Sequence, residues 1–274
     1  MKPASPKILV FDSGLGGLTV LAEILALRPD ALCTYAADDA VFPYGRLEEA
    51  ELVARLEEVM AALIPRCLPD IVVIACHTAS TLVLPGLRAA YPALPFVGTV
   101  PAIKPGAEAS RSGLVSVLAT PGTVARDYTQ ALVRDFAGHC RVTLVGAPRL
   151  AGFAEDFMQG GELDRAALAN EIAPAFVEAD GARTDVIVLA CTHFPLLLPL
   201  LAEMAPWPVH WIDPAPAIAR RVDQVLGRAG GAGAQGPHPA MFTSGRKPGA
   251  ALARVLRQRG LEALDWALAP RWPA

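Results

Sequence analysis

The sequence has little charge, few cysteines and no long apolar run. Charged residues make up 19% of its 274 residues, the net charge is −3 and the pI is about 6.0. This balance gives no indication of a nucleic-acid partner or of binding to an anionic membrane. No apolar run approaches the roughly 20 residues that a helix needs to cross a bilayer. The first residues, MKPASPK, lack the apolar core of a signal peptide.

The cysteines are too few and too dispersed to indicate a disulfide framework. There are five, an odd number without dense spacing. We therefore expect a cytoplasmic protein, in which thiols stay reduced. Because 53% of the residues are hydrophobic, the chain is expected to be globular, and its length is compatible with one or two domains.

Signatures of common cofactor sites and of serine hydrolases are also missing. The segment Gly14-Leu15-Gly16-Gly17 resembles a phosphate loop, but Thr19 stands where the last glycine of GxGxxG is needed. Neither GxSxG nor GxxxxGK followed by Ser or Thr occurs. No lysine follows a predicted strand in a context suited to a pyridoxal Schiff base. The sequence thus predicts no cofactor.

What the sequence does contain is one pattern that occurs twice. Residues 70–76 read DIVVIAC and residues 185–191 read DVIVLAC. Each run predicts a strand buried on both faces, and each ends in a cysteine followed by small polar residues. In open α/β sheets, ligands bind beyond the carboxyl ends of the strands. Cys76 and Cys191 are therefore placed where chemistry occurs, as two acid–base groups that can face one substrate from opposite sides.

Strand patterns alternate with helical patterns along the chain, which predicts parallel sheets joined by crossover helices. The order of elements restarts near residue 114. We therefore predict an α/β fold of two pseudo-symmetric, doubly wound domains, with mainly parallel sheets and the active site in the cleft between them. The expected strands are 7–11, 31–37, 71–75, 96–100, 114–119, 141–146, 186–190, 209–212 and 241–243. The expected helices are 18–27, 47–63, 80–90, 124–136, 163–179 and 248–258, and 227–239 is an expected loop.

The chain is expected to cross between the two domains twice. Residues 1–99 and 208–274 form the first predicted domain, which carries Cys76. Residues 100–207 form the second, which carries Cys191. The last segment of the chain is therefore expected to return to the first sheet.

Small polar residues gather in the loops that follow predicted strands, at 12–13, 42–45, 76–80, 120–123 and 191–193. Their hydroxyl groups, and the backbone N–H groups beside glycine, suit a small anionic ligand such as a carboxylate. These loops are the expected substrate site.

His193 follows Cys191 closely in the sequence. A protonated His193 would favour the thiolate form of this cysteine, and a purely structural histidine is the alternative. A zinc site is the sharpest rival, because Cys76, His77, Cys191 and His193 would form a Cys₂His₂ set. Adjacent ligands are awkward around one ion and the spacing is not the usual one, so we predict no metal.

Six motifs in chain order resemble those of the glutamate racemase family. They extend over about residues 8–225, and their combination is far more specific than any one of them. The matching stretches are Phe11-Asp12-Ser13-Gly14 with Gly16-Gly17, Pro43-Tyr44-Gly45, Ala75-Cys76-x-Thr78-Ala79-Ser80, Val100-Pro101-Ala102-Ile103-Lys104-Pro105, Ala119-Thr120-x-Gly122-Thr123 and Cys191-Thr192-His193-Phe194-Pro195-Leu196-Leu197.

This resemblance implies cofactor-independent racemisation of glutamate, a small-molecule substrate, to supply D-glutamate for peptidoglycan. A homodimer is left open. The resemblance also implies that Cys76 deprotonates the D-isomer and Cys191 the L-isomer, and that Asp12 and His193 assist. The residues expected to hold the substrate are Asp12, Ser13, Tyr44, Gly45, His77, Thr78, Thr120, Thr123, Thr192 and His193.

Two positions depart from the family pattern. The family has Asn, which normally contacts substrate, where this chain has His77. A protonated His77 could stabilise the Cys76 thiolate, or the side chain could simply fill the space. The family's assisting glutamate is displaced, and Glu155 is its nearest equivalent. These departures keep open a racemase of the same superfamily that acts on aspartate or another small acidic compound. A Cys/His zinc hydrolase and a non-catalytic amino-acid-binding relative are less favoured.

Overall fold

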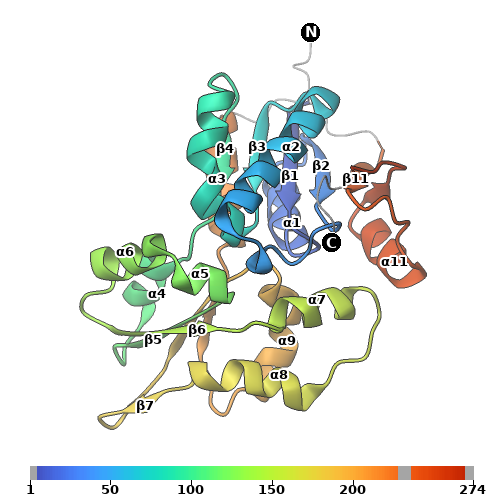
Figure 1. The fold of residues 1–274 in the computed structure, drawn as a ribbon. Coiled ribbons are helices and arrows are strands. Elements are labelled where there is room, and N and C mark those ends of the chain that lie inside the picture. The colour runs from blue at the N-terminus through green and yellow to red at the C-terminus, as the bar shows by residue number, and fades with distance from the viewer. Residues whose placement is uncertain (1–4, 228–235, 269–274) are drawn as a thin grey trace.

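The computed structural model describes residues 5–227 and 236–268 and contains two separate parallel sheets (Figure 1). The first sheet has the order β12-β11-β2-β1-β3-β4, and all its neighbouring strands run parallel. Its strands are β1 (Lys7–Asp12), β2 (Leu32–Ala37), β3 (Ile71–Ile74), β4 (Phe96–Gly98), β11 (His238–Phe242) and β12 (Leu261–Ala263). Because β11 pairs with β2, the expected return of the last segment to the first sheet is confirmed.

The second sheet repeats the strand order of the first. It consists of β5 (Leu114–Ala119), β6 (Arg141–Gly146), β9 (Val186–Ala190) and β10 (His210–Ile212), in the parallel order β10-β9-β5-β6. Read from the other edge, the order β6-β5-β9-β10 matches β2-β1-β3-β4 strand for strand. The predicted fold of two pseudo-symmetric parallel α/β units is therefore confirmed, and the cysteine strands β3 and β9 occupy equivalent places.

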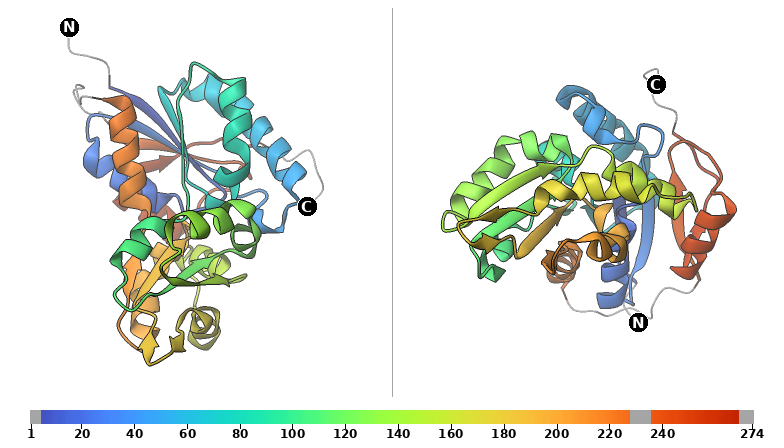
Figure 2. Two further views of the ribbon diagram at one scale, coloured as in Figure 1. Left: turned by 90° about the vertical axis from the view of Figure 1, so that its left-hand side faces the viewer. Right: turned by 90° about the horizontal axis from the view of Figure 1, so that it is seen from below.

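Helices connect the strands and cover both faces of each sheet (Figure 2). Those around the first sheet are α1 (Leu18–Leu27), η1 (Tyr44–Arg46), α2 (Glu49–Cys67), α3 (His77–Ala90), α10 (Ala215–Leu226) and α11 (Ala250–Gln258). Those around the second sheet are α4 (Ile103–Ala109), α5 (Pro121–Ala125), α6 (Asp127–Phe136), α7 (Leu150–Met158), α8 (Arg165–Ile172), η2 (Ala173–Ala175), η3 (Phe194–Leu197) and α9 (Leu198–Met204). No helix among the described residues is long and apolar enough to span a bilayer.

The helix expected at 163–179 is wrong in its second half. Helix α8 ends at Ile172, and the chain continues into an antiparallel hairpin of β7 (Glu178–Ala179) and β8 (Ala182–Arg183). The hairpin turn has φ values of 53° at Asp180 and 80° at Gly181, which is the geometry that an Asp-Gly pair favours. Because the Asp-Gly pair favours a hairpin turn, the helix ends earlier than the apolar pattern indicated.

The division of the chain at residues 99/100 and 207/208 remains a prediction, but one strand near the second crossing is informative. Strand β10 pairs with β9 and so belongs to the second sheet. Helix α10, which follows it, packs against α1 of the first unit. The sheet pairing thus places the return of the chain after Ile212. The loop expected at 227–239 lies mostly outside the described residues.

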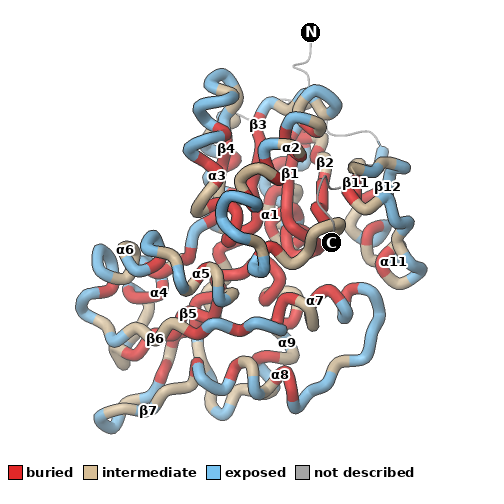
Figure 3. Tube along the Cα trace, viewed as in Figure 1, coloured by how far each residue is buried: buried red, intermediate tan, exposed pale blue. Residues whose placement is uncertain are grey.

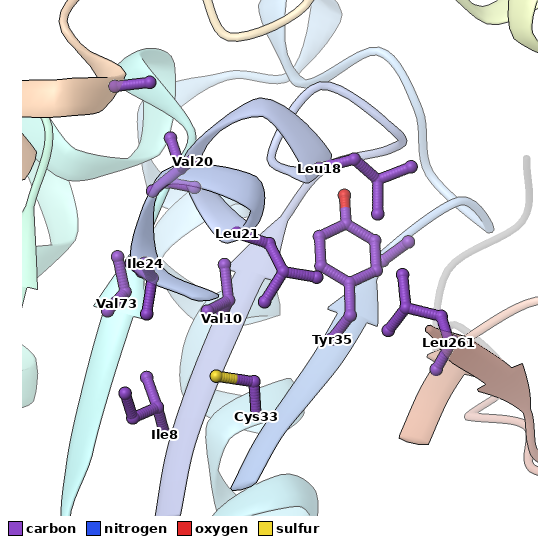
Figure 4. Packing of buried hydrophobic residues seen from close by; sticks show 14 of the residues in the cluster. Ile8, Val10, Leu18, Val20, Leu21, Ile24, Cys33, Tyr35, Val73 and Leu261 are labelled. Atoms are coloured by element: carbon purple, nitrogen blue, oxygen red, sulfur yellow. The ribbon is translucent and has the colours of Figure 1, made fainter. Parts of the chain in front are cut away.

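Alternation along the central strands sorts the core into layers on either side of each sheet. Ile8 and Val10 of β1 pack with α1 on one face, as Figure 4 shows, whereas Leu9 and Phe11 pack with α2 and α3 on the other. Strands β3, β5 and β9 are buried at every residue, and β1 is buried from Ile8 onward (Figure 3). A strand buried on both faces needs an unbroken apolar sequence, which explains the duplicated pattern.

Candidate active site

The carboxyl ends of strands from both sheets meet in one polar cluster. The side chain of Thr192, after β9, donates a hydrogen bond to Asp12 Oδ2 at the end of β1, over 2.8 Å. The hydroxyl oxygens of Thr78 and Thr120 lie 3.2 Å apart and join the start of α3 to the start of α5. Residues that are far apart in the sequence are therefore brought together between the two units, as the strand-end rule predicts.

Asp12 lies at the centre of this cluster and is fully buried. Its Oδ1 accepts hydrogen bonds from the Gly14 backbone N–H at 3.0 Å and from the Ser13 hydroxyl at 3.2 Å. Burial raises the pKa of the Asp12 carboxyl, while the positive charge of His193 and the Thr192 hydroxyl act in the opposite direction. Asp12 thus joins both strand ends and acts electrostatically on Cys76 and on His193.

Cys76 follows β3 and precedes α3, and its thiol is 6% exposed. The Sγ atom lies 3.6 Å from the hydroxyl oxygen of Ser13. Burial, and then the negative charge of Asp12, raise the pKa of Cys76 to about 12. This shift favours the protonated thiol of Cys76 at neutral pH.

Cys191 has the opposite electrostatic surroundings. Its Sγ lies 3.9 Å from Nδ1 of His193, and Nε2 of the same ring lies 2.8 Å from Oε1 of Glu155. Burial by itself lowers the pKa of His193. The hydrogen bonds to Cys191 and Glu155 and the charge of Asp12 outweigh it and raise that pKa well above the ordinary value. A protonated imidazole beside Cys191 favours negative charge on this sulfur.

Glu155 is the residue whose role the sequence left open, and α7 carries it to the imidazole. Besides His193, its Oε1 accepts the backbone N–H of Leu15 at 2.5 Å. The glycine loop must come very close for this contact: a Cβ at Gly14 would lie 2.2 Å from Glu155 Oε1, and one at Gly16 would lie 2.5 Å from His193 Nδ1. The glycines that resemble a phosphate loop therefore serve a close approach of backbone to side chains.

Three threonine hydroxyls, from the starts of α3 and α5, form a second polar group. Thr120 and Thr123 are 3.0 Å apart, and Thr78 lies 3.4 Å from Thr123. A Cβ on Gly45 would lie 4.0 Å from the Cβ of Thr120, which places the backbone of Gly45 beside this group. Hydroxyls and exposed backbone of this kind can hold a carboxylate.

Tyr44 was expected to contact the substrate, but its side chain contacts Asp38 instead. Its hydroxyl donates to Asp38 Oδ2 at 2.6 Å, and the residue is only 2% exposed. Two residues earlier, the ring of Phe42 lies 5.3 Å from the ring of His193. In this structure the segment therefore presents backbone and Phe42 to the cleft, whereas the Tyr44 phenol points into the first unit.

His77 is buried at the first turn of α3, with only 2% exposure. Its Nε2 lies 3.4 Å from the hydroxyl oxygen of Thr99, and its Nδ1 has no hydrogen-bond partner among the residues that the structure describes. Burial lowers the pKa of His77 to about 3. Burial therefore disfavours a cationic His77 at neutral pH and favours the neutral side chain.

The described residues contain no group of three or more His, Cys, Asp or Glu side chains arranged to hold a metal ion. What the cluster does offer is two thiols from equivalent strands, one beside a carboxylate and one beside an imidazolium. The same cluster contains several hydroxyl groups that can donate to an anionic group. Such a site can remove a proton from one face of a small acid and return a proton to the other face.

The sequence matches the family model described as Asp/Glu/Hydantoin racemase over residues 25–222. The chain is 53% identical to a glutamate racemase of Brucella canis over 266 residues, covering 94% of this chain and 96% of the relative. It is 54% identical to a glutamate racemase of Mesorhizobium japonicum over 255 residues, with 93% and 97% covered.

A solved structure is also similar over nearly the whole chain. It is the crystal structure of Escherichia coli glutamate racemase in complex with L-glutamate and the activator UDP-MurNAc-Ala. The TM-score is 0.86 and the sequence identity 37%, with 94% of this chain and 96% of the other covered. The two-unit architecture is thus shared over almost the full length.

Proposed function

The chain belongs to the Asp/Glu/Hydantoin racemase family, and on this premise we propose that it interconverts L- and D-glutamate without a cofactor. Relatives named glutamate racemase cover most of its length at more than half identity. The structurally similar E. coli enzyme binds L-glutamate. The enzyme is accordingly an amino-acid racemase, and a small dicarboxylic amino acid is its substrate.

One observation carries this proposal: two buried thiols stand at equivalent strand ends in opposite electrostatic surroundings. Cys76 and Cys191 are each 6% exposed, and they are close enough for the charge of Cys191 to contribute to the raised pKa of Cys76. Inverting a stereocentre requires a base on one face and an acid on the other. A thiolate at Cys191 and a thiol at Cys76 meet this requirement for L-glutamate.

The proposed step balances without any further reactant. The Cys191 thiolate takes the Cα proton of L-glutamate, and the electron pair of the broken C–H bond is delocalised into the adjacent carboxylate. Cys76 then donates its proton to the opposite face of Cα, which gives D-glutamate, a Cys191 thiol and a Cys76 thiolate. The reverse reaction exchanges the roles.

The surrounding groups support the developing charge. Asp12 lies beside Cys76 and His193 lies beside Cys191, so the two thiols have different electrostatic surroundings. The threonine hydroxyls and the Gly45 backbone are placed to bind carboxylate groups. Burial of the cluster excludes water, which strengthens each of these interactions. Ser13, Thr78, Thr120, Thr123 and Thr192 are the hydroxyl residues that we assign to substrate binding.

Circular dichroism at a wavelength sensitive to the stereocentre tests the proposal. The wild-type protein should convert either glutamate isomer to the racemate after treatment with EDTA. Cys76→Ala and Cys191→Ala should each lose at least the ~10²–10⁴-fold that one positioned acid or base contributes. Cys140→Ala, which removes a free thiol outside the cluster, is the control and should retain turnover.

The outcome also separates the rival functions. No turnover of glutamate together with turnover of aspartate would assign the substrate to aspartate. Tight binding of glutamate without turnover would make the protein a binding relative. Near-normal turnover in either active-site cysteine variant would overturn the two-base mechanism.

The same proposal assigns a cellular role. We propose that the product D-glutamate is used for peptidoglycan and that the protein acts in the cytoplasm, where both thiols stay reduced. Cells depleted of the protein should then grow when D-glutamate is supplied. A homodimer also remains a prediction, which a mass measurement in solution decides.

A further inference from the structure

A carboxylate and a guanidinium are buried together beside the active site, and the proposed mechanism uses neither. Asp38 is fully buried and the Arg55 side chain is 1% exposed. Asp38 follows β2, and its backbone N–H donates to the carbonyl of Asp12 at 2.9 Å, so it is directly next to the strand end that carries the site. Arg55 reaches it from α2.

The pair has an unusually complete set of hydrogen bonds. Arg55 donates through Nε to Asp38 Oδ2 at 2.9 Å and through Nη2 to Oδ1 at 2.6 Å. The Tyr44 hydroxyl donates to Oδ2 and the Thr243 hydroxyl to Oδ1, both at 2.6 Å. Four donors from three separate elements therefore converge on one carboxylate.

Stability alone is a weak reason for such an arrangement. Desolvating two charges offsets much of their attraction, and apolar replacements of similar volume are often no less stable. A satisfied, bidentate pair does fix the positions of the groups around it, because charge-assisted hydrogen bonds are short and directional. The question is which of the attached groups needs that precision.

Of the three attached elements, the segment 42–45 reaches the active site. At one end the Phe42 ring lies 5.3 Å from the His193 ring, and at the other the Gly45 backbone lies beside Thr120. Between these two contacts, the Tyr44 hydroxyl joins the segment to Asp38. The separation of the Gly45 backbone from Thr120 therefore depends on where Asp38 holds the Tyr44 hydroxyl.

We propose that Asp38 and Arg55 are positioning residues for substrate binding, and that they act through the Tyr44 hydroxyl to hold the Gly45 backbone against the carboxylate of the amino-acid substrate. This inference rests on the proposed racemase function. Neither Asp38 nor Arg55 touches the substrate in this account. Their effect is therefore expected in the affinity for glutamate and not in the chemical step.

Tyr44→Phe is the sharpest test, because it removes one hydroxyl and keeps the buried ring. Asp38 retains three of its four donors, so the fold should persist. We expect KM for both glutamate isomers to rise about tenfold, the lower part of the range for a hydrogen bond to a charged group, while kcat changes by less than about threefold. Arg55→Lys, which keeps the charge but loses the bidentate geometry, should raise KM in the same way.

Glu58→Gln is the matched control. Glu58 contacts Nη1 of Arg55 at 2.9 Å, on the side of the guanidinium away from Asp38. This variant weakens a charged contact of the same guanidinium and should leave KM unchanged. A KM within twofold of wild type in Tyr44→Phe, or an equal KM rise in Glu58→Gln, would overturn the inference. Absence of glutamate turnover in the wild-type protein would instead overturn the proposed function.

Discussion

Replacing Glu155 by Gln should shift the pH dependence of racemisation to lower pH. Glu155 is 9% exposed and its Oε1 lies 2.8 Å from Nε2 of His193. Gln keeps the size of the side chain and an oxygen that can accept from both His193 and the Leu15 backbone N–H. The substitution therefore removes one negative charge from the imidazole and changes little else.

The size of the shift follows from this contact. Gln replaces a hydrogen bond to a charged group, which contributes roughly 1.5–3 kcal/mol, by a neutral one of about 1 kcal/mol, so the pKa of His193 should fall. The pKa of His193 is raised in the folded protein, so the imidazolium is present below that pKa and lost above it. If catalysis needs the imidazolium beside Cys191, the alkaline limb of the rate profile should move to lower pH by roughly one pH unit, because 1.36 kcal/mol corresponds to a tenfold change.

The assay is kcat/KM for L- and D-glutamate as a function of pH, followed by circular dichroism. Because the isomers are mirror images of equal free energy, kcat/KM must change equally in both directions, which provides an internal check. Asp156→Asn is the control, since Asp156 is the next acidic residue, is exposed and has no hydrogen bond to His193. An alkaline limb of Glu155→Gln that overlays the wild-type curve, or an equal shift in Asp156→Asn, would refute the reasoning.

Three further predictions concern single side chains. Since burial lowers the pKa of His77 to about 3 from 6.5, stability should fall as pH drops through this window. Urea denaturation at pH 5 and pH 7 should show a loss of about 2 kcal/mol that His77→Asn abolishes, while kcat/KM is kept or improved. A loss of ~100-fold would instead make His77 a working group. Thr120→Val should raise KM for glutamate roughly tenfold in steady-state assays, because it removes a donor at the carboxylate side of the cleft. Burial raises the pKa of Cys33 to about 12, so stability should fall as pH rises above 9, and Cys33→Ala should melt with a smaller drop between pH 8 and pH 10.5.

The sequence predicted the central strands best and some helices poorly. The bounds expected for β5 and β9 are those observed, because a strand buried on both faces has an unbroken apolar pattern with little room for another interpretation. Helix α10 was not expected, although it carries an amphipathic pattern. Its first turn contains Pro216, and proline in a first turn is compatible with a helix because no N–H partner is needed there.

The site could be predicted as far as strand ends determine it. The rule that ligands bind at the carboxyl ends of parallel strands was sufficient to bring Asp12, Cys76 and Cys191 together. The contact of Glu155 with His193 depends on how α7 packs across the cleft, which no local pattern encodes. The pair of Asp38 and Arg55 was missed for a similar reason, since a loop acid and a helix arginine carry no sign that they will be buried together.

The two units share a pseudo-symmetric backbone, but the side chains around their two cysteines differ. The proposed chemistry requires this difference. Equivalent strands place two thiols on opposite sides of one site, but a racemase that held both in the same protonation state would have two bases or two acids. Burial and the charge of Asp12 raise the pKa of Cys76, whereas Cys191 has the imidazole of His193 beside it. In the proposed mechanism the free enzyme is thereby prepared for L-glutamate. One turnover would leave the thiols in the reverse arrangement, which is the form that D-glutamate needs. Single substitutions at Asp12, Glu155 or His193 should therefore change kcat and KM separately in the two directions, although their ratio stays bound by the equal free energy of the two isomers.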